Sequence, residues 1–128
     1  MTQNQEIATQ GPVCIVDDDI AVCDSLSVLL ETRGFAVFTY ASGTEFLKDD
    51  RRRTAKCLVI DQHMPGLDGL DVVRELQRDG VFLPAILITG RLDARIAQHA
   101  GALGVRAVME KPFPVAQLVD LVGSCLQV

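Results

Sequence analysis

The chain has 128 residues, 48% of them hydrophobic, and a net charge of −5 at pH 7. This length fits one ordinary domain with its own hydrophobic core, and the acidic balance argues against a nucleic-acid-binding surface, which would be basic. No hydrophobic run approaches the roughly 20 residues of a membrane-spanning helix, and the polar start of the chain lacks a signal peptide's hydrophobic segment. We therefore predict a cytoplasmic protein with a polar tail at residues 1–11 and one domain at residues 12–128.

Four cysteines (Cys14, Cys23, Cys57 and Cys125) are scattered along the chain without the Cys-x-x-Cys spacing of a metal site. Cys14 and Cys57 stand inside hydrophobic runs, where cysteine packs as a small buried hydrophobic residue. We expect all four to be free thiols in a reducing compartment.

Short hydrophobic runs alternate with amphipathic segments five times along the chain. Wholly hydrophobic runs are typical of strands that are buried on both faces, and hydrophobic residues at helical spacing indicate helices. In chain order we predict a strand at 13–16, a helix at 19–33, a strand at 35–40, a helix at 42–48, a strand at 57–60, a helix at 69–78, a strand at 84–88, a helix at 93–103, a strand at 105–109 and a helix at 115–126. The basic run 51–53 is interpreted as a solvated loop. Five strand–helix units predict an α/β fold with a parallel sheet covered by helices on both faces.

Polar side chains stand at the ends of four predicted strands, where α/β sheets gather their functional groups. Asp17 and Asp18 follow the first strand and Asp61 follows the third. Carboxylates this close together favour a cation between them, and hard oxygen ligands suit Mg²⁺ or Mn²⁺. Thr89 after the fourth strand and Lys111 after the fifth add a hydroxyl and a positive charge. Together these groups match what the transfer of a phosphoryl group needs.

Four stretches, each at a strand end, resemble the motifs of response-regulator receiver domains in their order and spacing. They are residues 13–19 (VCIVDDD), 58–69 (LVIDQHMPGLDG), 86–90 (ILITG) and 110–113 (EKPF). The resemblance covers about residues 12–127. It implies a single doubly wound, flavodoxin-like α/β domain with five helices and a five-stranded parallel sheet, and it supplies the strand order 2-1-3-4-5.

The same resemblance implies three reactive roles. Asp61 looks like the phosphoacceptor, Thr89 like the switch hydroxyl that moves toward the phosphoryl group, and Lys111 like the lysine that pairs with it. The bond between Lys111 and Pro112 resembles one that is usually cis in the family.

The resemblance also implies a metal site for Mg²⁺ or Mn²⁺. Asp18, Asp61 and the backbone carbonyl of His63 look like direct ligands, while Asp17 acts through water.

Three positions depart from the family's usual pattern. Val108 stands where an aromatic residue often couples to the switch hydroxyl. His63 lies two positions after the acceptor and Arg91 two positions after the switch hydroxyl, at positions that tune how fast the phosphoryl group is lost. We predict that the bulk and charge of His63 and Arg91 slow the attack of water.

The predicted function is a phosphorylation switch in two-component signalling. A sensor histidine kinase or phosphotransfer protein would supply the phosphoryl group, and the chain would catalyse only its own phosphorylation and dephosphorylation. A surface on the fourth helix, fifth strand and fifth helix would then engage a downstream effector. A homodimer through the fourth and fifth helices is an open alternative, and neither nucleic acid nor membrane is an expected partner of this chain.

Other functions fit the sequence less well. A degenerate receiver that binds a partner without phosphorylation is the main alternative, and Val108 is the residue that favours it. An aspartate-nucleophile phosphatase would need a second aspartate where His63 stands. A flavin-binding domain would need aromatic residues over the flavin ring, and the chain has one Tyr and no Trp.

Overall fold

The computed structural model of the protein describes residues 10–126. In chain order its elements are β1 (Gln10–Val16), α2 (Ile20–Thr32), β2 (Phe35–Tyr40), α3 (Gly43–Lys48), the 3₁₀ turn η1 (Asp50–Arg53), β3 (Cys57–Asp61), α4 (Gly69–Arg78), β4 (Ala85–Thr89), α5 (Ala94–Ala102), β5 (Ala107–Glu110) and α6 (Val115–Leu126). The strands form one parallel sheet in the order β2-β1-β3-β4-β5. The predicted fold class, strand order and five helices are therefore confirmed.

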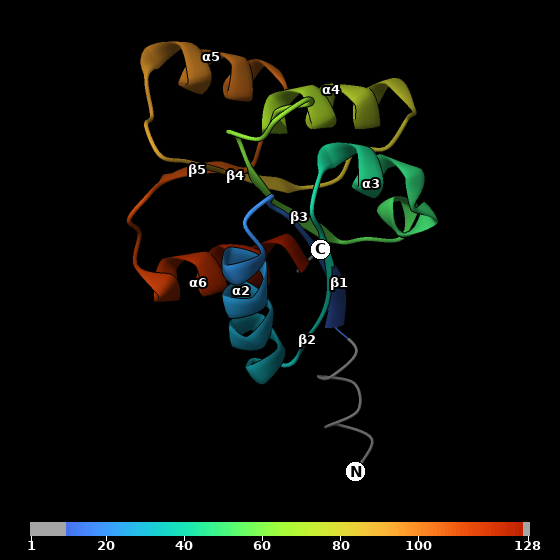
Figure 1. Ribbon diagram of the computed structural model, residues 1–128, viewed down its shortest axis with the longest axis vertical. Helices are drawn as coiled ribbons and strands as arrows, with labels where there is room; N and C mark the ends of the chain where they lie inside the picture. Colours follow the sequence, from blue (N-terminus) through green and yellow to red (C-terminus); the bar gives the residue numbers. More distant parts are fainter. Residues whose placement is uncertain (1–9, 127–128) are drawn as a thin grey trace.

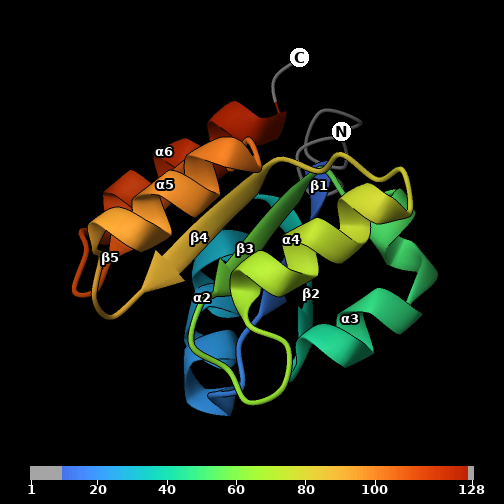
Figure 2. The ribbon, with the colours of Figure 1, turned by 90° about the horizontal axis from the view of Figure 1, so that it is seen from above.

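The sheet separates two layers of helices (Figures 1 and 2). α2 and α6 cover one face, and α3, α4 and α5 cover the other. Successive side chains of a strand point to opposite faces, so Val13 and Ile15 join the core under α2 and α6, while Cys14 and Val16 join the core under α3, α4 and α5. Because helices cover both faces, β3 is buried at every position, as its unbroken hydrophobic run predicts.

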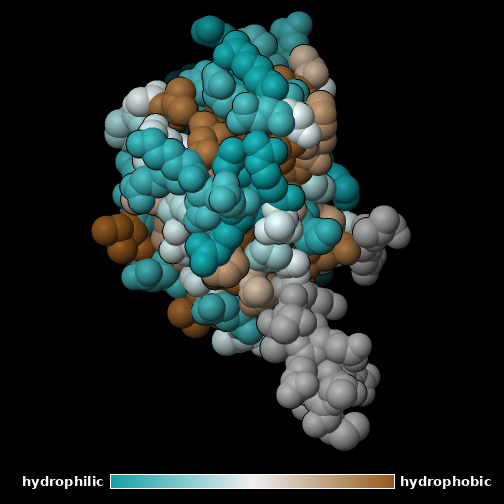
Figure 3. All heavy atoms as spheres, turned by 90° about the vertical axis from the view of Figure 1, so that its right-hand side faces the viewer, coloured by the Kyte–Doolittle hydropathy of each residue, from teal (hydrophilic) through white to brown (hydrophobic). Residues whose placement is uncertain are grey.

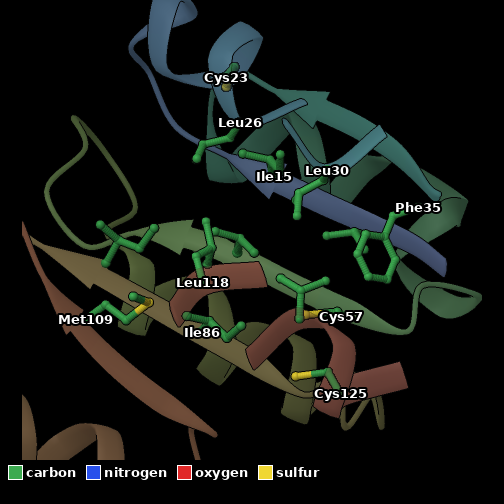
Figure 4. Close-up of a cluster of buried hydrophobic side chains, with 14 residues drawn as sticks. Ile15, Cys23, Leu26, Leu30, Phe35, Cys57, Ile86, Met109, Leu118 and Cys125 are labelled. Carbon is green, nitrogen blue, oxygen red and sulfur yellow. The ribbon is translucent and has the colours of Figure 1, made fainter. Parts of the chain in front are cut away.

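All four cysteines are buried free thiols, as predicted. Cys57 on β3 and Cys125 on α6 belong to the core under α2 and α6, where their sulfur atoms face each other (Figure 4). Burial raises the pKa of Cys14 to about 11. A hydrogen bond with the Cys57 thiol instead lowers the pKa of Cys125.

Short polar side chains set the starts of the helices. The Asp19 carboxylate accepts the N–H groups of the first turn of α2, and Ser42 and Asp93 do the same for α3 and α5. At α4, Asp68 accepts the N–H of Asp71 at 2.8 Å while Asp71 accepts the N–H of Asp68 at 3.1 Å, which is a reciprocal capping box. Two of these caps, Asp19 and Asp68, fix the helices that follow β1 and β3.

Two predictions about the chain's irregular parts need correction. β1 begins at Gln10, within the predicted tail, because Gln10 pairs with Phe35 across a break in the strand register. The rest of the predicted tail lies outside the described residues. The basic run predicted to be a solvated loop forms η1, because the Asp49 side chain accepts the N–H of Arg51 and caps the turn. The guanidinium of Arg51 also lies 4.1 Å from the ring centre of Phe38.

The surface adds two observations. Seen from the right-hand side of Figure 1, the molecule is mostly hydrophilic, with its hydrophobic residues scattered (Figure 3). Among residues 10–126, no helix is both long enough and hydrophobic enough to span a membrane.

Candidate functional site

The parallel register of the sheet brings the first acidic residues together. The last paired residues of β1 and β3 are Val16 and Ile60. Asp17 and Asp61, which come next, therefore lie at the same edge of the sheet, and Asp18 continues the chain from Asp17. Each of these three carboxyl groups offers an oxygen that lies within 4.8 Å of the others.

The environment of these carboxylates favours a positive charge among them. Asp17 and Asp61 are 4% and 6% exposed, whereas Asp18 is exposed. Burial raises the pKa of Asp17, and the negative charges of Asp61 and Asp18 raise it further. The backbone N–H of Asp19, which donates to Asp17 Oδ1 at 2.9 Å, and the charge of Lys111 act in the opposite direction.

Thr89 and Lys111 join the site from β4 and from the end of β5. Thr89 pairs with Glu110 in the sheet, and the N–H of Lys111 donates to the Thr89 carbonyl at 2.9 Å. The Lys111 ammonium lies 3.4 Å from Asp61 Oδ1, with the lysine side chain 41% exposed. The bond that follows, to Pro112, is cis, as the resemblance implies.

The carboxylate of Asp61 keeps one oxygen available. Within residues 10–126, no group makes a hydrogen bond of acceptable geometry to the buried Oδ1. A buried carboxylate oxygen without a donor is costly and is stabilised by any cation or donor that approaches it. The carboxylates of Asp17, Asp18 and Asp61 form a donor set that fits a hard divalent cation such as Mg²⁺ or Mn²⁺.

Thr89 has an unexpected neighbour in His63. The threonine is fully buried, and its Oγ1 lies 2.9 Å from Nε2 of the His63 ring. The same hydroxyl donates to the carbonyl of Arg91 at 3.1 Å and accepts the N–H of Arg91 at 3.2 Å. The sequence suggested the backbone carbonyl of His63 as a metal ligand and its side chain as a group that slows the attack of water, but it did not suggest this contact with Thr89.

Gln62 and Gly69 hold the loop after Asp61; the resemblance implies that Asp68 and Gly69 belong to the turn that shapes this loop, whereas nothing in the sequence indicated the role of Gln62. Gln62 is 7% exposed, and its side-chain oxygen accepts the N–H of Leu70 at 2.9 Å. A Cβ atom on Gly69 would lie 2.8 Å from the Asp61 carbonyl oxygen and 2.6 Å from Leu87 Cδ1, so the close approach of α4 to β3 requires glycine. The sequence signal for both residues was their place in the receiver-like stretch 58–69.

Comparison with known proteins agrees with this geometry. A family profile described as "Response regulator receiver domain" matches residues 13–123. The chain belongs to the response regulator receiver domain family. It is accordingly a phosphorylation-based switch of two-component signalling, and its family is one of signalling phosphoacceptors rather than classical enzymes.

The similar receiver domains come from longer proteins. The transcriptional regulatory protein FixJ of Azorhizobium caulinodans is 38% identical over 115 residues, which are 90% of this chain and 54% of FixJ. The response regulator protein TodT of Pseudomonas putida is 36% identical over 90% of this chain and 51% of its own length. This chain thus spans about half the length of these curated relatives.

The fold matches solved receiver domains equally well. The crystal structure of FixJ-N superposes with a TM-score of 0.80 and 31% identity, covering 91% of this chain and 94% of the other. The chemotaxis protein CheY4 of Vibrio cholerae gives a TM-score of 0.84 and 25% identity over 92% of this chain and all of CheY4.

Proposed function

We propose that Asp61 is the residue of this receiver domain that accepts the phosphoryl group. One carboxylate oxygen attacks phosphorus in line, the bond to the donor's leaving group breaks, and an acyl phosphate forms on Asp61. The observation that carries the proposal is the buried Asp61 Oδ1, which accepts no hydrogen bond of acceptable geometry from residues 10–126 and lies beside the Lys111 ammonium and among the acidic residues.

We further propose that the acidic cluster holds Mg²⁺ or Mn²⁺. Asp18, Asp61 and the carbonyl of His63 would bind the ion directly, and Asp17 would hold it through water. A bound divalent cation supplies charge neutralisation for both the carboxylates and the phosphoryl oxygens. Burial chiefly raises the pKa of Asp17, and the negative charges of Asp61 and Asp18 add to the rise; a cation bound here would offset that added repulsion, which supports the assignment.

Lys111 and Thr89 act after the transfer in this proposal. The Lys111 ammonium, already 3.4 Å from Asp61, pairs with a phosphoryl oxygen, and the Thr89 hydroxyl turns to donate to another. This second state shifts a pre-existing equilibrium toward an effector-binding surface on α5, β5 and α6. Supporting this, Ala100 is the one buried residue among the nine of α5, so little packing holds that helix.

The partners follow from the same chemistry. We propose that a sensor histidine kinase or phosphotransfer protein supplies the phosphoryl group in the cytoplasm, and that a downstream effector protein or domain reads the switched surface. The names of FixJ and TodT, both regulatory proteins, support an effector function in a longer protein. A homodimer through α5 and α6 stays a prediction.

The test is intact-mass spectrometry after incubation with acetyl phosphate and Mg²⁺, comparing the wild type with Asp61→Asn. We expect one added phosphoryl group in the wild type and none with EDTA or in the variant. Glu110→Gln, a change at an exposed side chain next to Lys111, is the matched control and should keep the adduct. An adduct that persists in Asp61→Asn would refute the assignment of Asp61. A folded, metal-binding wild type that gains no mass would favour the degenerate receiver.

A further inference from the structure

The hydroxyl of Thr89 has no free hydrogen-bonding capacity in this structure. A threonine hydroxyl offers one donor and two acceptor positions. Its proton goes to the Arg91 carbonyl, and its two acceptor positions face the N–H of Arg91 and Nε2 of His63. Either tautomer of the ring completes this contact: Nε2–H donates to Thr89 Oγ1, or an unprotonated Nε2 accepts the hydroxyl proton in place of the Arg91 carbonyl.

We propose that His63 is a positioning residue that holds the switch hydroxyl in its resting state. The inference rests on the proposed function, because the alternative partner of Thr89 is a phosphoryl group on Asp61. His63 lies two residues after Asp61 in the loop between β3 and α4, whereas Thr89 ends β4. The imidazole thus links the loop of the acceptor to the residue that has to move when the acceptor is modified.

Release of this bond opposes switching. When Thr89 turns toward Asp61, its hydroxyl leaves the Arg91 backbone, and His63 Nε2 loses its partner. Because the His63 side chain is exposed, water replaces the lost partner, and the net effect of such a bond on an equilibrium is about two- to tenfold. His63 therefore lowers the population of the switched state by that factor.

Val108 cannot replace the contact of His63 with Thr89. Val108 is half-buried against the core under α3, α4 and α5, and it has no ring or polar group that can follow the hydroxyl of Thr89. The ring that contacts Thr89 belongs to His63 instead. It follows β3, whereas Val108 lies on β5, and these two strands flank β4 on opposite sides.

The experiment measures the affinity of the Mg²⁺-loaded protein for beryllofluoride, a phosphoryl analogue, by ¹⁹F NMR. His63→Ala removes the ring, and His63→Phe keeps a ring of similar size without Nε2. We expect both variants to bind beryllofluoride about two- to tenfold more tightly than the wild type. In a Thr89→Val background, the same two substitutions should change the affinity by less than twofold, because the contact is already lost.

A second measurement does not depend on the acceptor chemistry. The chain has two histidines, so the ¹⁵N resonances of the His63 ring can be followed with His99 as the internal reference. Thr89→Val should move the Nε2 resonance of His63 and leave that of His99 in place. An unmoved His63 resonance would overturn the contact itself.

The outcomes separate the inference from the proposed function. If the wild type binds no beryllofluoride, the phosphoacceptor assignment fails. If the wild type binds it and His63→Phe matches the wild type while His63→Ala does not, the bulk of the ring acts rather than its nitrogen, and the positioning role is refuted. Equal affinities in all three proteins would refute it as well.

Discussion

Replacing Gly69 with alanine should loosen both the fold and the candidate site. Gly69 is the first residue of α4, and a Cβ atom there would lie 2.8 Å from the Asp61 carbonyl oxygen, 2.6 Å from Leu87 Cδ1 and 3.1 Å from Gln62 Cα. Two of these three neighbours are backbone atoms, which no side-chain rotation can move away. Relief therefore requires α4 to move away from β3, and overpacking of this kind costs about 2 kcal/mol.

Gly101→Ala is the matched control, because it adds the same methyl group where nothing lies within 4 Å. Gly101 is an exposed residue of α5, and alanine there should raise the free energy of unfolding by up to about 1 kcal/mol through helix propensity. Urea unfolding followed by circular dichroism at 222 nm suits a chain without tryptophan. Displacement of the Asp61 backbone in Gly69→Ala should also slow phosphorylation by acetyl phosphate about tenfold or more. If Gly69→Ala unfolds at the wild-type urea concentration or higher, the steric reasoning about the approach of α4 to β3 is wrong.

Three further predictions concern charge and thiol chemistry. Lys111→Met removes the positive charge 3.4 Å from Asp61, so Mg²⁺ should bind roughly three- to tenfold more tightly in isothermal titration calorimetry. Weaker binding would contradict the idea that the lysine repels the cation. In EDTA, Asp17→Asn should be more stable than the wild type at pH 7. The folded state raises the pKa of Asp17, chiefly through burial, so the ionisation of Asp17 disfavours folding. The stability gained by Asp17→Asn should therefore shrink as the pH falls through that pKa toward 3.8. A gain independent of pH would count against this cause. Iodoacetamide at pH 7 should label Cys125 before the three other cysteines. The Cys57 thiol lowers the pKa of Cys125, and Cys125 also lines a cavity of about 420 Å³. Peptide mapping that finds another cysteine labelled first would contradict this order.

The sequence predicted the part of the site that depends on the sheet alone. Asp61, Thr89 and Lys111 each follow a hydrophobic run, and parallel strands deliver the residues after such runs to one edge. Their proximity therefore needs only the strand order and register. The strands and helices were predictable because buried strands and capped helices leave strong local patterns, whereas the strand order came from the resemblance to receiver domains.

The features that the sequence did not predict depend on side-chain orientation or on local capping. The contact of His63 with Thr89 joins residues 26 positions apart through one ring orientation, which no spacing rule encodes. η1 forms because the Asp49 side chain caps it. The three consecutive arginines favoured an interpretation as an exposed loop, so this cap was not recognised in the sequence. The extension of β1 to Gln10 depends on a pairing with Phe35 beyond an irregular stretch of the strand.

In the proposed mechanism, the loop after β4 transmits a change at Asp61 to the rest of the molecule. Thr89 is the last residue of β4, and Leu92, three residues later in the loop, donates its N–H to the Glu110 carboxylate at 2.9 Å. That bond ties the loop to the end of β5, directly before Lys111. A shift of the Thr89 hydroxyl toward Asp61 would therefore act on β5 through the loop backbone and need no aromatic side chain at position 108. α5, which follows this loop, has Ala100 as its one buried residue, so a movement of this helix costs little packing.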